Sequence, residues 1–431
     1  MDRGLNKFWN ILRHGPAISG ARQKPEVPFP GTPADNHGQS PEPVSFCIQT
    51  PRSGKADFRV VGIFLLIILF AGCVKSYNPP AILSDYHYLV VQGSLVSSPD
   101  SPTVITLSRT VQLSDTTASL SVETGARVEI ADPSGALIPL TEIQPGQYEA
   151  APTVLNPSQT YQLKITTSNG VEYASDFVPV LQTPPIDSIN WLQPGDLTIY
   201  ANSHDPTGNI HNFRWDYQET WQYRAHLDRE VGVDNGLMYY TDSTHQTYNC
   251  WISHSSSDIL LGSTVALSQD QISGFPLLTI PQNSQKLSVR YSILVKQYAL
   301  TDSAFQYLGV LKKNTENLGS IFDAQPTQLI GNFHSVTHPS ETVIGYLTAS
   351  TVSQQRIFIS HSELQDWNYA YTGRYCDSVY IPQNPSNYLL YNYPDTSYSP
   401  YYIATGAIVL TRTSCVDCRA AGGTNQKPGF W

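Results

Sequence analysis

Cysteine is the residue type in this sequence whose spacing suggests the most specific chemistry. Cys73 follows the small pair Ala71-Gly72 and an apolar run from Val60 to Phe70. A lipoprotein signal peptidase cleaves at this pattern after the cysteine thiol has been diacylated. The run is too short for a helix that crosses a hydrocarbon core of about 30 Å, which needs about 20 residues. We therefore predict a lipoprotein signal and cleavage site at 60–72, with lipidation at Cys73.

The sequence on both sides of the apolar run also fits an export signal. Basic residues precede it at Arg52, Lys55 and Arg59, and residues 73–82 form a polar tether that contains prolines. The alternative is a buried strand or helix of a globular core, because periodicity alone cannot assign a short apolar run. Residues 1–59 contain a long polar segment that no signal peptide needs, so we interpret them as a non-native or disordered preamble.

Four further cysteines have the even number expected of disulfides in an exported chain: Cys250, Cys376, Cys415 and Cys418. Three pairings are possible, and the sequence does not choose among them. The close pair Cys415-Val-Asp-Cys418 could instead be a redox or metal motif. A redox motif would begin a helix, whereas the strand-like run 407–412 precedes this pair. A four-cysteine zinc site usually contains two close pairs. We favour structural disulfides.

Other patterns that could carry chemistry are weaker. His334 and His338 have a spacing that would bind a metal on a helix, but the Ser, Thr and Pro around them predict a loop. Residues 205–209 resemble part of a calcium-binding loop, although they fit equally well as a turn that enters a strand. The sequence contains no phosphate loop, dinucleotide fingerprint or Gly-x-Ser-x-Gly motif. A pair of glycosidase carboxylates cannot be assigned from one sequence. We therefore predict no catalytic residue, no metal site and no cofactor.

A tyrosine-rich segment, 388–402, is the strongest candidate for binding. Tyrosine supplies a large, stiff and amphipathic contact area, which suits a protein or glycan interface. The alternative is a long irregular loop packed on its own domain. The candidate interface residues are Tyr388, Tyr391, Tyr393, Tyr398, Tyr401 and Tyr402.

Composition narrows the class of protein. The formal net charge is −10, and charged residues make up only 14% of the chain, while tyrosine is abundant. An acidic surface argues against a nucleic-acid partner, which needs a basic footprint. The composition is typical of an exported β-rich protein.

The elements that must position these residues are mostly strands. Runs at 88–95, 103–109 and 126–131, together with a hairpin at 161–175, predict an immunoglobulin-like β-sandwich over 83–180. Its prolines make 181–190 a stiff linker. Residues 191–431 then form a larger β-rich domain, with a central strand at 287–298 and one clear helix near 302–318. We predict a mainly β fold with these two domains.

Several of these segments resemble a known family, the Bacteroidota lipoproteins described as domain of unknown function 4249. The matching segments are 88–93, 125–130, 185–188, 291–300, Gly345-Tyr346 and, most strongly, the tail 415–431. The resemblance implies an outer-membrane lipoprotein whose gene often lies beside that of a TonB-dependent receptor. It implies no activity. Whether the body faces the periplasm or the cell surface stays open.

These observations lead to one expected function and two alternatives. We expect a non-enzymatic, lipid-anchored outer-membrane protein that is accessory to a TonB-dependent transporter, through substrate capture or receptor contact. The alternatives are an adhesin or envelope-structural lipoprotein and, less favoured, a hydrolase whose site the sequence does not reveal.

Overall fold

The computed structural model describes residues 87–111, 121–234, 237–242, 245–316, 329–370, 375–382 and 397–431. The predicted preamble, the export signal with Cys73, the tether and the tyrosines Tyr388, Tyr391 and Tyr393 lie outside these residues. The described residues are mainly β, as predicted, and α3 (Asp302–Glu316) is their one helix longer than four residues. None of their helices combines the length and apolarity that a membrane span requires.

Residues 89–181 form ten strands around one hydrophobic core. They are β1 (Leu89–Gly93), β2 (Leu95–Ser97), β3 (Thr103–Arg109), β4 (Ser121–Val122), β5 (Arg127–Ala131), β6 (Leu137–Gln144), β7 (Gln147–Ala150), β8 (Thr160–Thr166), β9 (Glu172–Ser175) and β10 (Val178–Leu181). The predicted alternation is confirmed in β8, where Tyr161, Leu163 and Ile165 are all buried and Lys164 is exposed. The immunoglobulin-like arrangement of these strands stays a prediction.

The predicted boundary between two domains at residues 181–190 is wrong in one respect, because later residues complete the first core. Phe333, in β20 (Phe333–Ser335), and Leu347 are buried among the side chains of the first ten strands. Gly345 approaches β1 so closely that a Cβ there would lie 2.5 Å from the Val91 carbonyl oxygen. Pairing between such distant segments leaves no local pattern in the sequence, so strand periodicity could not reveal it.

The predicted linker is also shorter and more tightly bound than expected. Strand β10 continues to Leu181, and β11 (Ile186–Leu192) begins five residues later. Between them, the Thr183 hydroxyl donates a 2.5 Å hydrogen bond to the Thr351 carbonyl, and the Thr351 hydroxyl accepts one from the Thr183 backbone N–H. Residues 87–431 accordingly group as one compact unit instead of two.

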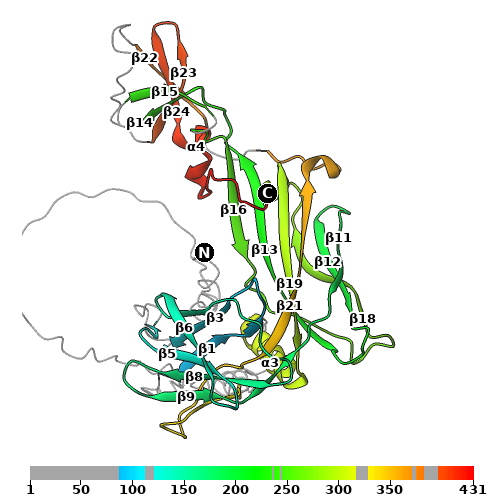
Figure 1. Ribbon diagram of the computed structural model, residues 1–431. Coiled ribbons are helices and arrows are strands. Elements are labelled where there is room, and N and C mark those ends of the chain that lie inside the picture. Colours follow the sequence, from blue (N-terminus) through cyan, green and yellow to red (C-terminus); the bar gives the residue numbers. More distant parts are fainter. Residues whose placement is uncertain are drawn as a thin grey trace, which may run out of the picture. The chain divides into compact units, whose positions relative to one another are not determined.

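A second core lies between longer strands (Figure 1). These strands are β11, β12 (Leu197–His204), β13 (Asn212–Arg224), β16 (Asn249–Ser255), β17 (Leu260–Ser263), β18 (Gln271–Ile280), β19 (Arg290–Leu300) and β21 (Ala349–Ser360). The order β21-β19-β13-β16 makes β19 a central strand, as predicted from its alternating apolar residues. Strand β21 also pairs in parallel with β2 and β10, so a single strand joins the sheets of both cores.

Helix α3 confirms the predicted helix, but it buries a different face. The Thr301 hydroxyl caps it by accepting a hydrogen bond from the Ala304 backbone N–H at 3.3 Å. Its buried residues are Ala304, Tyr307 and Thr315. The apolar residues Phe305, Leu308 and Leu311, whose spacing of three predicts the buried face of a helix, are only half-buried. The Lys312 ammonium and the Glu316 carboxylate bind the backbone at Ile259, and these polar contacts orient the helix instead.

Candidate functional site

Two small sheets share a core and carry the described tyrosines of the predicted interface. They are the hairpin β14 (Val231–Asp234) and β15 (Leu237–Tyr240), and the three-stranded sheet β22 (Ser378–Pro382), β24 (Ala407–Arg412) and β23 (Tyr398–Ala404). Val231, Met238, Ile408 and Leu410 are buried between them. The Glu230 backbone N–H donates a 2.8 Å hydrogen bond to the Tyr401 carbonyl. We call residues 230–240, 375–382 and 398–412 the tyrosine module.

The three described candidate tyrosines, Tyr398, Tyr401 and Tyr402, lie on β23 and are half-buried. In this part of the segment, the alternative of an irregular loop is wrong. The Tyr398 hydroxyl donates a 2.6 Å hydrogen bond to Asp377, whose carboxylate also lies 3.0 Å from Arg412. The hydrogen bond from Tyr398, followed by the Arg412 charge, lowers the pKa of Asp377.

Tyr402 belongs to a group of neighbouring aromatic rings. Its ring packs edge-on against Tyr401, with centroids 5.0 Å apart. A hydrogen bond with the Tyr380 hydroxyl is the main cause of a raised Tyr402 pKa, and the nearby Glu230 charge contributes. The Tyr402 hydroxyl therefore stays protonated at neutral pH and is held by its hydrogen bond with Tyr380.

Sequence reasoning missed three exposed tyrosines of the module because they lie outside the tyrosine-rich run. The side chains of Tyr240, Tyr375 and Tyr380 are 73%, 94% and 61% exposed. For Tyr380, a signal exists in the alternation of β22, where the half-buried Val379 and Ile381 pack on the small core and Tyr380 between them faces solvent. An exposed tyrosine between two inward apolar residues is evidence for a contact surface.

The four cysteines form two disulfides, one that attaches the C-terminal tail to the second core and one that lies beside the tyrosine module. Cys250 of β16 bonds to Cys418, and Cys376 bonds to Cys415. Cys415 lies in the short helix α4 (Thr413–Val416), and Cys418 opens the 3-10 turn η4 (Cys418–Ala421). Because Cys415 and Cys418 bond to different distant partners, they do not form the redox pair that their spacing allowed.

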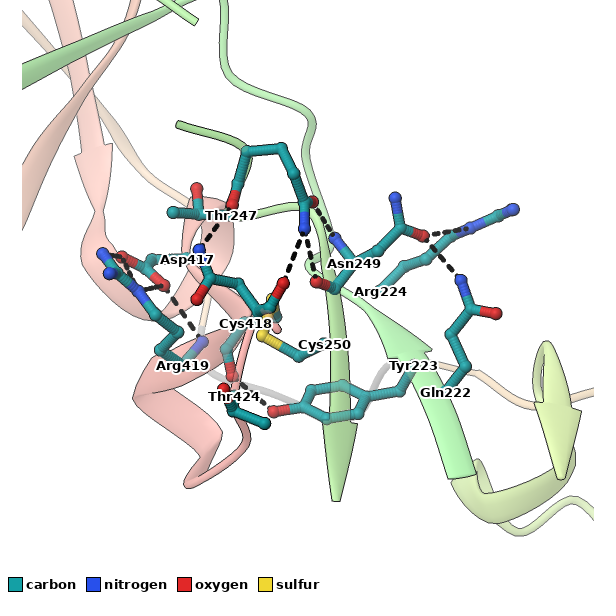
Figure 2. Close-up of a disulfide and its surroundings, with 12 residues drawn as sticks. Gln222, Tyr223, Arg224, Thr247, Asn249, Cys250, Asp417, Cys418, Arg419 and Thr424 are labelled. Atoms are coloured by element: carbon teal, nitrogen blue, oxygen red, sulfur yellow. Dashed lines mark hydrogen bonds and ion pairs between the residues drawn. A yellow bond between two sulfur atoms is a disulfide. The ribbon is translucent and has the colours of Figure 1, made fainter. Parts of the chain in front are cut away.

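The surroundings of the Cys250–Cys418 disulfide fix the start of the C-terminal tail (Figure 2). The Tyr223 hydroxyl donates a 2.5 Å hydrogen bond to the Cys418 carbonyl, and the Cys418 N–H donates to the Thr247 carbonyl at 2.9 Å. Thr424 then exchanges backbone hydrogen bonds with Trp251 of β16, at 2.8 and 3.0 Å. The sulfurs are buried, so the disulfide is a structural anchor.

Beyond Thr424, the tail packs its last two aromatic residues on strands of the large sheet. The Trp431 ring packs edge-on against Trp251 of β16 and Phe358 of β21, at centroid distances of 6.4 and 5.7 Å. The Arg356 guanidinium of β21 lies 3.6 Å from the centre of the Phe430 ring. The unusual tail sequence is thus explained by packing.

Thr264, His211 and Asp270 are the residue types of a nucleophile, a base and an acid, but their geometry does not match a catalytic triad. The Thr264 hydroxyl donates to the Asp270 carboxylate. His211 Nδ1 lies 3.2 Å from the Asp270 carboxylate and 3.4 Å from the Thr264 hydroxyl, so both groups face the same ring nitrogen. In a triad, the nucleophile and the acid contact opposite ring nitrogens. This cluster ties neighbouring segments together.

Glu219, which is only 6% exposed, forms the most buried charged cluster among the described residues. The Lys286 ammonium lies 2.5 Å from one of its oxygens, and the Tyr291 hydroxyl donates to the other at 3.0 Å. Burial, and next the Glu219 charge, raises the pKa of Tyr291 well above its usual range. Both carboxylate oxygens are satisfied, as stability requires of a buried charge.

The predicted metal candidates have other roles. Asp205 accepts hydrogen bonds from the backbone N–H groups of Thr207, Asn209 and Ile210, so residues 205–209 form the turn between β12 and β13. His334 lies in β20, which corrects its expected position in a loop. Within the described ranges, no group of three or more His, Cys, Asp or Glu side chains could hold a metal ion.

Residues 74–356 match the family described as "Domain of unknown function (DUF4249)". The chain belongs to this family. The match begins directly after Cys73 and ends in β21. The tail 415–431 therefore lies beyond the matched residues, although it is the strongest segment of the resemblance seen in the sequence. The family description names no activity, and no catalytic family is indicated.

Comparison with curated proteins and solved structures says little about this chain beyond its family. A search of curated proteins found no match. One similar solved chain comes from a structure titled "Complete structure of manganese lipoxygenase of Gaeumannomyces graminis and partial structure of zonadhesin of Komagataella pastoris". It shares 10% identity, and the alignment covers 50% of this chain and 90% of that chain with a TM-score of 0.15, a likeness too low to carry an argument.

Proposed function

We propose that this protein is a lipid-anchored, non-enzymatic binding protein of the outer membrane that serves a TonB-dependent transporter. The observation that carries the proposal is the tyrosine module, in which exposed aromatic side chains stand on strands held by two disulfides. Side chains on a rigid support lose little conformational entropy on binding, and tyrosine loses little of its own. Such a surface suits recognition of a partner.

A lipid anchor would bring this surface close to a partner in the membrane. An acyl group on Cys73 would keep the body close to the membrane, which raises the effective concentration of any membrane protein beside it. The family match supports this arrangement, because the part of the chain that defines the family begins directly after the predicted lipidated cysteine. A weak contact through the tyrosine module is then sufficient for a stable association.

Affinity purification from native membranes tests the proposal. A β-barrel receptor should copurify with the tagged protein, and the double substitution Tyr380→Ala/Tyr402→Ala should reduce its recovery several-fold, because it removes two neighbouring rings of the module. Phe177→Ala is the matched control, since Phe177 is 46% exposed and lies outside the module. Recovery of no barrel protein, or equal recovery with both variants, contradicts the proposal.

The adhesin alternative predicts a different outcome of the same experiment. An adhesin or envelope-structural protein would bind a surface polymer or an insoluble envelope fraction and would copurify without a receptor. The tyrosine substitutions would then reduce retention by the polymer and leave the membrane-protein profile unchanged.

A further inference from the structure

A cavity of about 740 Å³ lies beside the tyrosine module. Residues that flank the β14–β15 hairpin form its walls, together with residues that precede β16. The lining side chains are those of Asp228, Arg229, Glu230, Tyr240, Thr241, Asp242, Gln246 and Thr247. Its volume falls within the range of about 300–1,000 Å³ that is typical of small-ligand sites.

Backbone and side-chain hydrogen bonds hold the walls in place. The Thr241 hydroxyl donates to the Arg229 carbonyl at 2.6 Å, and the Thr241 N–H donates to the Glu230 carbonyl at 2.9 Å. On the other side, the Gln246 amide donates to the carbonyls of Asn249 and Asn425. The Cys250–Cys418 disulfide lies beside this second wall. The cavity is therefore preformed, which favours ligand binding.

One polar group in the lining lacks a partner within the described residues. The Nε of Arg229 is buried and makes no hydrogen bond there. The Nε itself is too buried to meet a ligand, but the Arg229 side chain lines the cavity and its guanidinium carries only hydrogen-bond donors. Arg229 therefore calls for a ligand that accepts hydrogen bonds.

The rest of the lining requires a ligand that also donates hydrogen bonds. The carboxylates of Asp228, Glu230 and Asp242 accept hydrogen bonds only, and all three residues are exposed. An anionic ligand would be repelled by these carboxylates, whereas a cationic ligand would leave the Arg229 donor unsatisfied. A neutral ligand with many hydroxyl groups meets both requirements, because each hydroxyl donates and accepts.

An aromatic ring supplies the remaining part of the site. The Tyr240 side chain lines the cavity and is 73% exposed, so a flat face of a ligand can pack on its ring. Hydroxyl groups along the edge and an apolar C–H face are the chemistry of a pyranose ring. We propose that this cavity binds a neutral oligosaccharide.

This inference goes beyond the proposed function, because glycan binding does not depend on whether a receptor is the partner. The test uses the purified full chain in lauryldimethylamine oxide, a detergent without a sugar headgroup. An array of neutral, acidic and aminated oligosaccharides identifies the class bound, and calorimetric titration with the strongest neutral oligosaccharide gives its affinity.

We expect binding of neutral oligosaccharides that weakens about tenfold or more in Tyr240→Ala and in Arg229→Gln. Tyr240→Phe should retain most of the affinity, because the ring is kept, and Phe177→Ala should retain all of it. Circular dichroism of each variant checks that the fold is intact. Binding only of acidic or aminated glycans, no binding of neutral glycans, or equal affinity in Tyr240→Ala overturns the inference. Receptor copurification that persists in Arg229→Gln, whose position lies outside the tyrosine module, separates failure of this inference from failure of the proposed function.

Discussion

Buried polar side chains connect the strands of the second core through specific hydrogen bonds. The Gln297 amide, which is fully buried on β19, donates to the Pro184 carbonyl at 2.9 Å and the Ser203 hydroxyl at 2.8 Å. Its oxygen accepts a 2.8 Å hydrogen bond from the Trp215 indole N–H. One glutamine thus joins β19, β13, β12 and the segment before β11, and it explains why the expected linker is part of the fold.

The pair of His204 and Asp187 gives a pH-dependent contact at the level of single residues. The Asp187 carboxylate lies 2.8 Å from His204 Nδ1, and this hydrogen bond, followed by the charge of Asp187, raises the His204 pKa above 6.5. The folded protein therefore binds the His204 proton more tightly than the unfolded chain. The stabilisation from this pair is complete below about pH 6.5 and is lost as the pH rises through the folded pKa.

We predict that NMR titration of the His204 ring will give a pKa above 6.5, and that Asp187→Asn will lower it. Asp100→Asn, at an exposed aspartate of the first half of the chain, should leave the His204 titration unchanged. A His204 pKa that does not respond to Asp187→Asn would show that the pair contributes nothing to its protonation.

At the level of elements, the two disulfides close loops of very different length. Cys250–Cys418 spans 168 residues and Cys376–Cys415 spans 39. Cross-linking restricts the unfolded chain more when the closed loop is longer, and the chain-entropy model gives about 5 kcal/mol for the long loop and about 4 kcal/mol for the short one. The first bond also holds the tail on β16, whereas the second holds the tyrosine module together.

We therefore predict that Cys250→Ala/Cys418→Ala lowers the free energy of unfolding more than Cys376→Ala/Cys415→Ala, by about 1 kcal/mol. Guanidinium unfolding of the two double variants measures this difference. Receptor binding should respond in the opposite order, because the second bond joins Cys376 of the tyrosine module to Cys415 directly after it. A larger loss of stability on removal of Cys376–Cys415 contradicts this account of the long loop.

At the scale of the whole molecule, the sequence predicted what local patterns determine. The hairpin predicted at 161–175 contains β8, and the helix predicted near 302–318 is α3. The packing of Phe333 into the first core depends on pairing between distant segments, for which one sequence contains no signal. The two domains expected from chain length consequently form one unit that is joined through β21.

The candidate site was only partly predictable for the same reason. Composition alone identified Tyr398, Tyr401 and Tyr402 as interface residues, because they lie within one tyrosine-rich run. Tyr240 is 158 residues before Tyr398 in the sequence, and a shared apolar core together with the Glu230–Tyr401 backbone hydrogen bond brings its hairpin beside β23. The Arg229 donor has no sequence signature, since only its burial without a partner distinguishes it from other arginines.

The proposed lipidation at Cys73 would determine where the whole molecule acts, and one substitution tests it. A single acyl chain gives only marginal and reversible membrane binding, whereas stable anchoring requires two such signals, and a diacylated cysteine supplies both chains. We predict that Cys73→Ala abolishes lipidation and releases the protein from membranes, as measured by mass spectrometry of the N-terminal peptide and by fractionation. Cys47→Ala, in the preamble, is the matched control and should stay membrane-bound. If Cys73→Ala remained in the membrane fraction, a contact other than the lipid would have to hold the protein there, and the tyrosine module would be the first surface to test.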